Sequence, residues 1–260
     1  MSGFLTEMAR LSRGRANALE RAVLLDRIRN TSPPPKLDTA GFGVIAEVKF
    51  SAPSAGILSE EADPVEAAVS RAQVYRNAGA RAISVLTEPS RFSGEISHLE
   101  AVAQAVDVPV MRKDFLVDPL QVVEARAFGA GGVLLIVRML DDETLQEMVH
   151  QAHDLGMFVL LEAFDATDIA RAEPYSDALI GLNCRDLQTL AVQPGRFGAL
   201  ANVFTTSQVR VAESGLRSVE DIESIIGLGY GMALVGSALM TSESPGRLLS
   251  SMAAVGYGVS

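Results

Sequence analysis

The sequence has 260 residues, of which 48% are hydrophobic and 21% are charged, with a formal net charge of −10. Such an acidic chain is a poor match for phosphate backbones, so we expect no nucleic acid partner. The longest apolar run, at 131–137, is far shorter than the roughly 20 residues that cross a bilayer, and the N-terminal residues lack the apolar stretch of a secretory signal. Cys184 is the only cysteine, which excludes an internal disulfide. These features predict a cytoplasmic protein without membrane contact.

The first forty residues precede any run typical of a strand, and we predict a helical extension over 1–40. Within it, apolar residues recur at helical spacing over 4–28, which indicates one amphipathic helix. The segment TSPPPKL (31–37) follows. Its prolines cannot continue a helix, so this segment is predicted to be extended.

Beyond this extension, short apolar runs alternate with amphipathic helical patterns. Eight runs are predicted as strands: 43–48, 82–87, 108–111, 131–137, 157–162, 178–183, 208–212 and 232–235. The helical patterns at 63–79 and 141–156 each begin at Asp and end at Gly, as helix caps do. Strands that are apolar on both faces and are followed by helices indicate a parallel sheet, either open and doubly wound or closed. Eight similar units favour the closed form, a single-domain (β/α)8 TIM barrel over 1–260.

Polar side chains are found where these predicted strands end. They are Glu47 and Lys49, Lys113 and Asp114, Glu162, Asn183, and Glu213 and Ser214. In a barrel, the carboxyl ends of the strands form the active site, so polar residues repeated at this end of many strands indicate an enzyme.

Two glycine-containing segments follow the last two predicted strands, AESGL (212–216) and VGSAL (235–239). Each is expected to open a helix, where free N–H groups attract an anion. Because the loops after strands seven and eight are the usual phosphate site of this fold, we assign Gly215, Gly236 and Ser237 to a phosphate group.

Over about residues 44–240 the chain resembles the indole-3-glycerol phosphate synthases, the ring-closing decarboxylases of tryptophan biosynthesis. The segments that carry the resemblance are IAEVKFSAPSAG (45–56), SVLTEPSRFSG (84–94), VPVMRKDFLVDPLQVVEARAFGAGGVLLI (108–136), LLEAFD (160–165), GLNCRDLQTL (181–190), VAESGL (211–216) and LVGSALM (234–240).

The resemblance implies a lyase that converts 1-(2-carboxyphenylamino)-1-deoxyribulose 5-phosphate into indole-3-glycerol phosphate without a cofactor or metal. The partner is then a small phosphorylated aromatic amine, and the protein is expected to be a monomer or a weak homo-oligomer. Ring closure needs an acid at the ketone oxygen, and the loss of that oxygen as water needs an acid and a base. We expect partial burial and neighbouring cations to lower the pKa of the acid, Lys113.

The resemblance also implies a role for each matching residue. Lys113 would be the acid and Glu162 the base, with Glu47 and Lys49 as a second charged pair, Asn183 as an orienting hydrogen-bond partner and Ser214 as a substrate contact. Further substrate-binding residues would be Pro53, Ser54, Phe92, Phe115, Leu134, Leu187 and Glu213, together with the phosphate residues Gly215, Gly236 and Ser237. Arg185 would anchor the loop after the sixth strand through nearby acids, and the N-terminal helix would lie across the barrel near the substrate.

The chain departs from the family pattern at three positions: Phe50 replaces a commonly basic residue, Ala52 stands where Ser is usual, and Cys184 where Asn or Ser is usual. A paralogue that supplies indole units to secondary metabolism therefore stays open as an alternative. A phosphoribosylanthranilate isomerase would need a Cys near the start of the barrel, and a non-catalytic binding protein would lack the charged residues. For His150 and His153 we expect no metal, and for Cys184 we expect buried packing.

Overall fold

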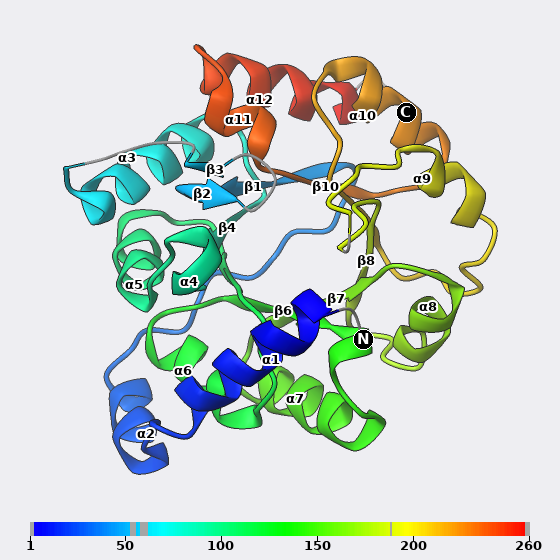
Figure 1. Cartoon of the computed structure of the whole chain (residues 1–260). Helices are drawn as coiled ribbons and strands as arrows, with labels where there is room; N and C mark the ends of the chain where they lie inside the picture. The colour runs from blue at the N-terminus through cyan, green and yellow to red at the C-terminus, as the bar shows by residue number, and fades with distance from the viewer. Residues whose placement is uncertain (1–2, 53–55, 58–61, 188, 258–260) are drawn as a thin grey trace.

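The computed structural model describes residues 3–52, 56–57, 62–187 and 189–257. Its eight long strands run parallel and form a closed barrel, seen in Figure 1. In barrel order they are β1 (Gly43–Val48), β4 (Ala82–Leu86), β5 (Val110–Lys113), β6 (Gly132–Ile136), β7 (Phe158–Ala163), β8 (Leu179–Asn183), β9 (Arg210–Glu213) and β10 (Met232–Val235). The barrel closes where β1 pairs with β10, with Gly43 opposite Met232. The predicted TIM barrel is confirmed.

Helices surround the barrel (Figure 1). Those that follow the strands are α3 (Pro64–Asn77), α5 (Ile96–Ala105), α6 (Pro119–Ala127), α7 (Asp142–Asp154), α8 (Ala166–Ala172), α9 (Gly195–Leu200), α10 (Val219–Gly227) and α12 (Pro245–Ala254). Shorter elements are α4 (Pro89–Phe92), α11 (Ser237–Thr241), the 3-10 helices η1 (Val137–Met139) and η2 (Val255–Tyr257), and the small hairpin of β2 (Ser51–Ala52) and β3 (Gly56–Ile57). Of these helices, none in the described part of the chain is long and apolar enough to cross a membrane.

The predicted helix caps are present. The Asp63 carboxylate accepts from the N–H groups of Val65 and Glu66 at the start of α3, and Asp141 accepts from the N–H of Thr144 in α7. Just beyond these helices, Gly79 and Gly156 have φ angles of 94° and 74°, which only glycine adopts without strain. Local chemistry therefore sets both ends of these two helices.

Two strands lie later in the sequence than predicted. β5 covers 110–113 rather than 108–111, and β9 covers 210–213 rather than 208–212. Pro109 has no N–H for the sheet, although its carbonyl accepts from Ile83. At the other end, Lys113 pairs with Leu86 of β4, and Glu213 pairs with Leu234 of β10. Both residues therefore end their strands instead of following them.

The single helix predicted over 4–28 is wrong, because two helices occupy this segment. They are α1 (Gly3–Ala16) and α2 (Arg21–Arg29), joined by a turn. The two apolar faces cover different surfaces: Leu5 and Met8 of α1 join the main core, whereas Leu24 of α2 packs against Val123 and Ala127 on α6. Figure 1 shows α2 beside α6. Residues 31–40 form neither helix nor strand, and the prolines within this segment cannot continue a helix.

Candidate active site

Two lysines and three glutamates meet inside the barrel at the carboxyl ends of its strands. The Nζ atom of Lys113 lies 3.0 Å from Oε2 of Glu162 and 3.6 Å from Oε2 of Glu213. Nζ of Lys49 lies 2.5 Å from Oε1 of Glu47. All three carboxylates are buried. Their parallel strands place these five side chains in one interior, although they lie up to 166 residues apart in a chain of 260.

Asn183 holds the Glu162 carboxylate together with Lys113. Its Nδ2 donates to Oε1 of Glu162 at 3.2 Å, so Lys113 and Asn183 each bind a different oxygen of one carboxylate. The amide oxygen of Asn183 in turn accepts from the backbone N–H of Arg185 at 2.9 Å. Both carboxylate oxygens of Glu162 are therefore held in place.

The expected lowering of the Lys113 pKa is wrong. Burial lowers it, but the charges of Glu162, Glu213 and Glu47 outweigh burial and raise the pKa of Lys113 above its ordinary value. Arg112, the cation next to Lys113 in the sequence, turns to the outer face of its strand and binds Glu124 on α6. Successive side chains of a strand point to opposite faces, so Arg112 and Lys113 do not share an environment.

Glu213 has the opposite electrostatic character. Burial raises its pKa well above the ordinary value, and the negative charge of Glu162 raises it further, against the effect of Lys113. Among the described residues, neither carboxylate oxygen of Glu213 has a hydrogen-bond partner. The neighbouring strand makes room for it, because a Cβ at Gly181 would clash with its Oε1. Glu213 is thus a buried carboxyl group with a raised pKa that lies between Lys113 and Glu162 in charge effect, the first lowering its pKa and the second raising it.

Glu47 is the member of the set whose pKa is lowered. Burial opposes its ionisation, but Lys49 and Lys113 outweigh burial and lower the pKa of Glu47. Two carboxyl groups in one cavity therefore have pKa values shifted in opposite directions, as a site that both donates and accepts protons requires.

A cavity of about 270 Å³ opens above these charged groups. The predicted site residues that line it are Glu47, Lys49, Phe92, Lys113, Phe115, Leu134, Glu162, Asn183, Arg185, Leu187, Glu213, Ser214, Gly215, Gly236 and Ser237. Pro53 and Ser54 lie outside the described residues. Sequence reasoning missed Phe4, Leu190, Val192, Arg217 and Thr241, which also line the cavity. These come from α1, from the end of α11 or from loops, where no strand end marks a position as facing the interior.

One wall of the cavity is aromatic. The ring of Phe115 lies edge-on to that of Phe4, with centroids 5.7 Å apart, and 6.0 Å from the ring of Phe92. Leu134 and Leu187 line the same cavity. This wall provides an apolar surface large enough for a flat ring.

The two predicted phosphate loops differ from each other. After β10, Gly236 is the N-cap of α11. Because glycine has no side chain, it cannot cap the first N–H groups of this helix. After β9, the expected helix start at 212–216 is wrong. The helix α10 begins only at Val219, and the side chains of Ser218 and Asp221 cap it. Ser214 and Gly215, with φ angles of 70° and 80°, instead form a turn beside the cavity.

Arg185 fixes its loop differently from the expected contact with acids. Its NH1 donates to the carbonyl of Leu190 at 2.9 Å, and its backbone forms an isolated antiparallel bridge with Val192. Burial lowers the pKa of Arg185, although the negative charge of Glu47 acts to raise it. The guanidinium therefore closes the loop after β8 through a backbone carbonyl.

The family model described as indole-3-glycerol phosphate synthase matches residues 12–252. The chain belongs to this family. Indole-3-glycerol phosphate synthases from Rhodococcus opacus and Mycolicibacterium smegmatis are 40% and 41% identical to it, over 93% and 92% of this chain and 92% and 89% of theirs. The enzyme of that name from Nocardioides is 44% identical over 86% of this chain and 85% of its own.

Solved structures of lower identity share the fold. The 3-hexulose-6-phosphate synthase of Salmonella typhimurium has a TM-score of 0.68 at 14% identity, covering 84% of this chain and 99% of its own. Tryptophan synthase subunit alpha of Legionella pneumophila has a TM-score of 0.60 at 14% identity, covering 93% and 100%. At this identity the likeness concerns the barrel alone.

Two departures from the family pattern concern residues away from the cavity surface. Phe50 is buried, and its ring lies edge-on to that of His98 at 5.4 Å, so it does not line the cavity. Cys184 is buried as predicted, and its Sγ donates to the carbonyl of Ser214 at 3.1 Å. The third departure, Ala52, lies in β2. Among the described residues, no group of three His, Cys, Asp or Glu side chains is placed to hold a metal ion, at His150 and His153 or elsewhere.

Proposed function

We propose that the chain is an indole-3-glycerol phosphate synthase of tryptophan biosynthesis, a carbon–carbon lyase that closes the indole ring of 1-(2-carboxyphenylamino)-1-deoxyribulose 5-phosphate with loss of carbon dioxide and water. The observation that carries this proposal is the contact between Lys113 and Glu162 inside a cavity with an aromatic wall. An acid and a base in contact suit a reaction that both donates and removes protons.

In this proposal the two ends of the substrate bind to opposite kinds of surface. The anthranilate ring lies against Phe92 and Phe115, and the phosphate lies at Gly236 and Ser237, where the uncapped start of α11 presents N–H groups. The ketone carbon between them then lies above Lys113. This orientation brings the ring carbon and the ketone carbon together, which lowers the entropic cost of the ring closure.

Lys113 acts as the proton donor. Its raised pKa keeps it protonated, so it is a hydrogen-bond donor to the ketone oxygen from the start. Attack of the ring carbon turns this oxygen into an alkoxide, which is a stronger base than a lysine amine, and the proton transfers. Loss of carbon dioxide restores the aromatic ring. Lys113 then regains a proton from solvent and donates it to the hydroxyl group, which leaves as water. Glu162, held by Lys113 and Asn183, accepts the proton that the carbon beside the ring nitrogen loses in this step.

Assay of the purified protein tests this function. We expect it to convert 1-(2-carboxyphenylamino)-1-deoxyribulose 5-phosphate into an indole, followed by absorbance, with one carbon dioxide released per turnover. Expression in a tryptophan auxotroph that lacks this step tests the pathway, and growth without tryptophan is the expected result. A protein that fails to form the indole from this substrate contradicts the proposal.

The proposal extends to the setting of the enzyme. We propose a single-domain protein over 1–260 that works in the cytoplasm as a monomer or weak homo-oligomer, without nucleic acid or a membrane as a partner. Contacts of α1 and α2 with the barrel support one domain, and the lone, buried Cys184 suits a reducing compartment. Light scattering of the purified protein over a range of concentrations measures the oligomeric state.

A further inference from the structure

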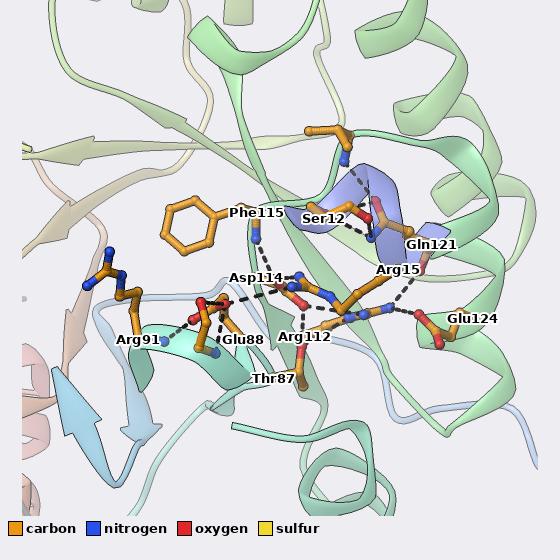
Figure 2. A network of polar contacts seen from close by, with 12 residues as sticks. Ser12, Arg15, Thr87, Glu88, Arg91, Arg112, Asp114, Phe115, Gln121 and Glu124 are labelled. Atoms are coloured by element: carbon orange, nitrogen blue, oxygen red, sulfur yellow. Dashed lines mark hydrogen bonds and ion pairs between the residues drawn. The ribbon is translucent and has the colours of Figure 1, made fainter. Parts of the chain in front are cut away.

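Helix α1 contacts the barrel through a charged side chain that reaches two acidic residues. The NH2 group of Arg15 lies 2.6 Å from Oδ1 of Asp114, and its NH1 group lies 3.7 Å from Oε1 of Glu88. Both carboxylates are buried, whereas the Arg15 side chain is 30% exposed. Figure 2 shows the guanidinium between the segment that follows β5 and the helix α4. One cation from the N-terminal extension thus joins two separate loops of the barrel.

Each of these acids supports the backbone of an aromatic residue in the cavity wall. Oδ1 of Asp114 accepts from the backbone N–H of Phe115 at 2.8 Å. The Glu88 carboxylate accepts from the N–H of Arg91 at 2.7 Å and caps α4, the helix that ends at Phe92. Arg15 therefore binds the two carboxylates that fix the backbones on which the Phe115 and Phe92 rings stand.

Asp114 is also held from its other side. Nε of Arg112 donates to Oγ1 of Thr87 at 3.1 Å, and this hydroxyl donates to Oδ2 of Asp114 at 2.9 Å. NH2 of Arg112 adds a direct contact to Oδ2 at 3.3 Å (Figure 2). Oδ2 is therefore bound by groups of the barrel itself, and Oδ1 by Arg15 and the N–H of Phe115. The contact between Arg15 and Oδ1 links α1 to these groups of the barrel.

Helix α1 brings the third ring of the wall. Phe4 lies near the start of α1 and contacts the edge of the Phe115 ring, with centroids 5.7 Å apart. Arg15 lies three turns further along the same helix. Phe4 therefore fixes the start of α1 through a ring contact, and Arg15 fixes its end through an ion pair.

We propose that Arg15 is a positioning residue for the aromatic end of the substrate, holding Phe4, Phe92 and Phe115 in the arrangement that receives a flat ring. This inference rests on the proposed function, since it takes the anthranilate ring as the group bound there. Arg15 itself does not line the cavity, so it acts through the three rings rather than by touching the substrate.

Binding measurements on Arg15→Met test the proposal. The probe is a substrate analogue whose ketone is reduced to an alcohol, which binds without reacting, and inorganic phosphate serves as a second probe for the opposite end of the cavity. We expect Arg15→Met to weaken binding of the analogue about tenfold, because the rings lose their arrangement, and to leave the Kd for phosphate within about twofold. Arg15→Lys keeps the charge but reaches one acid at a time, so an intermediate Kd is expected.

Two further variants separate positioning from general stability. Arg10→Met removes an exposed cation from the same helix and is expected to bind the analogue as the wild type does. In a Phe115→Leu background, Arg15→Met is expected to have a smaller effect on analogue binding, because one of the three rings through which it acts is absent. If Arg15→Met does not fold, the comparison of Arg15→Lys with the wild type, in both backgrounds, carries the test.

The outcomes separate this inference from the function on which it rests. A wild-type protein that neither converts the substrate nor binds the analogue overturns both. An active wild type whose Arg15→Met variant binds the analogue equally well overturns the positioning role alone. So does a variant that loses affinity for the analogue and for phosphate to the same extent, since a merely structural role weakens both ends of the site.

Discussion

The Nζ atom of Lys113 lies 3.0 Å from Oε2 of Glu162, and this contact joins β5 to β7 across the barrel interior, past the intervening strand β6. The acid and the base of the proposed reaction are therefore in contact before the substrate arrives. Their mutual attraction holds both side chains in place, and the ketone oxygen of the substrate must compete with Glu162 for the Lys113 proton.

Replacing Lys113 with Met is expected to lower kcat by about 10²–10⁴, the usual contribution of a general acid, with a smaller effect on KM. The substitution keeps the length of the side chain and removes the proton donor. Steady-state assays with the wild type and with Lys36→Met, which changes an exposed lysine, provide the comparison. Near-normal turnover of the Lys113 variant would show that the proton comes from elsewhere.

Glu213→Gln is expected to change how stability depends on pH. The pKa of Glu213 is raised above its ordinary value of 4.5, so the folded protein holds this proton more tightly than the unfolded chain does. This contribution to stability is fully present below about pH 4.5 and is lost as pH rises through the raised pKa. Gln stays neutral at every pH, so the Tm of the variant relative to the wild type is expected to rise as pH increases through the raised pKa of Glu213.

Thermal unfolding of both proteins up to pH 8 measures that difference. Below pH 4.5 the two curves are expected to run parallel, because both side chains are then neutral. A Tm difference that stays constant up to pH 8 would mean that Glu213 does not lose its proton in the folded protein over this range.

Gly181→Ala is expected to reduce turnover more than stability. The added Cβ would clash with Oε1 of Glu213, the far end of a side chain that can turn aside. Moving this carboxylate takes it from Lys113, so we expect kcat to fall about tenfold or more while Tm falls by only a few degrees. Gly227→Ala is the matched control, since nothing lies within 4 Å of its added Cβ. Equal kcat values for the two variants would contradict the positional role of Gly181.

Ser237→Asp is expected to raise KM steeply, by about tenfold or more, with little change in Tm. Its carboxylate would lie at the start of α11, where we place the phosphate, and like charges repel strongly in a partly desolvated pocket. Inhibition by inorganic phosphate is expected to weaken in parallel. Ser251→Asp, at an exposed position on α12, controls for the added charge. An unchanged KM would place the phosphate elsewhere.

The charged site residues follow from the sequence because strands repeat a simple rule. Glu47, Lys113 and Glu162 each lie at or near the end of a strand, and the carboxyl ends of parallel strands meet at one end of a barrel. The family resemblance supplied the aromatic residues Phe92 and Phe115, which no strand end marks. Phe4 could not be found in this way, since it reaches the cavity only because α1 folds back over the barrel.

The sequence by itself determined the eight alternating units, the capped ends of α3 and α7, and the strand ends that carry charge, because these depend on short-range periodicity and on local hydrogen bonds. Only the tertiary structure decided that the helical pattern over 4–28 breaks into two helices, since each half packs on a different surface. It also decided the direction of the Lys113 pKa shift. Arg112 adjoins Lys113 in sequence but faces α6, whereas three distant glutamates surround the amine, and electrostatic energy depends on distance in space.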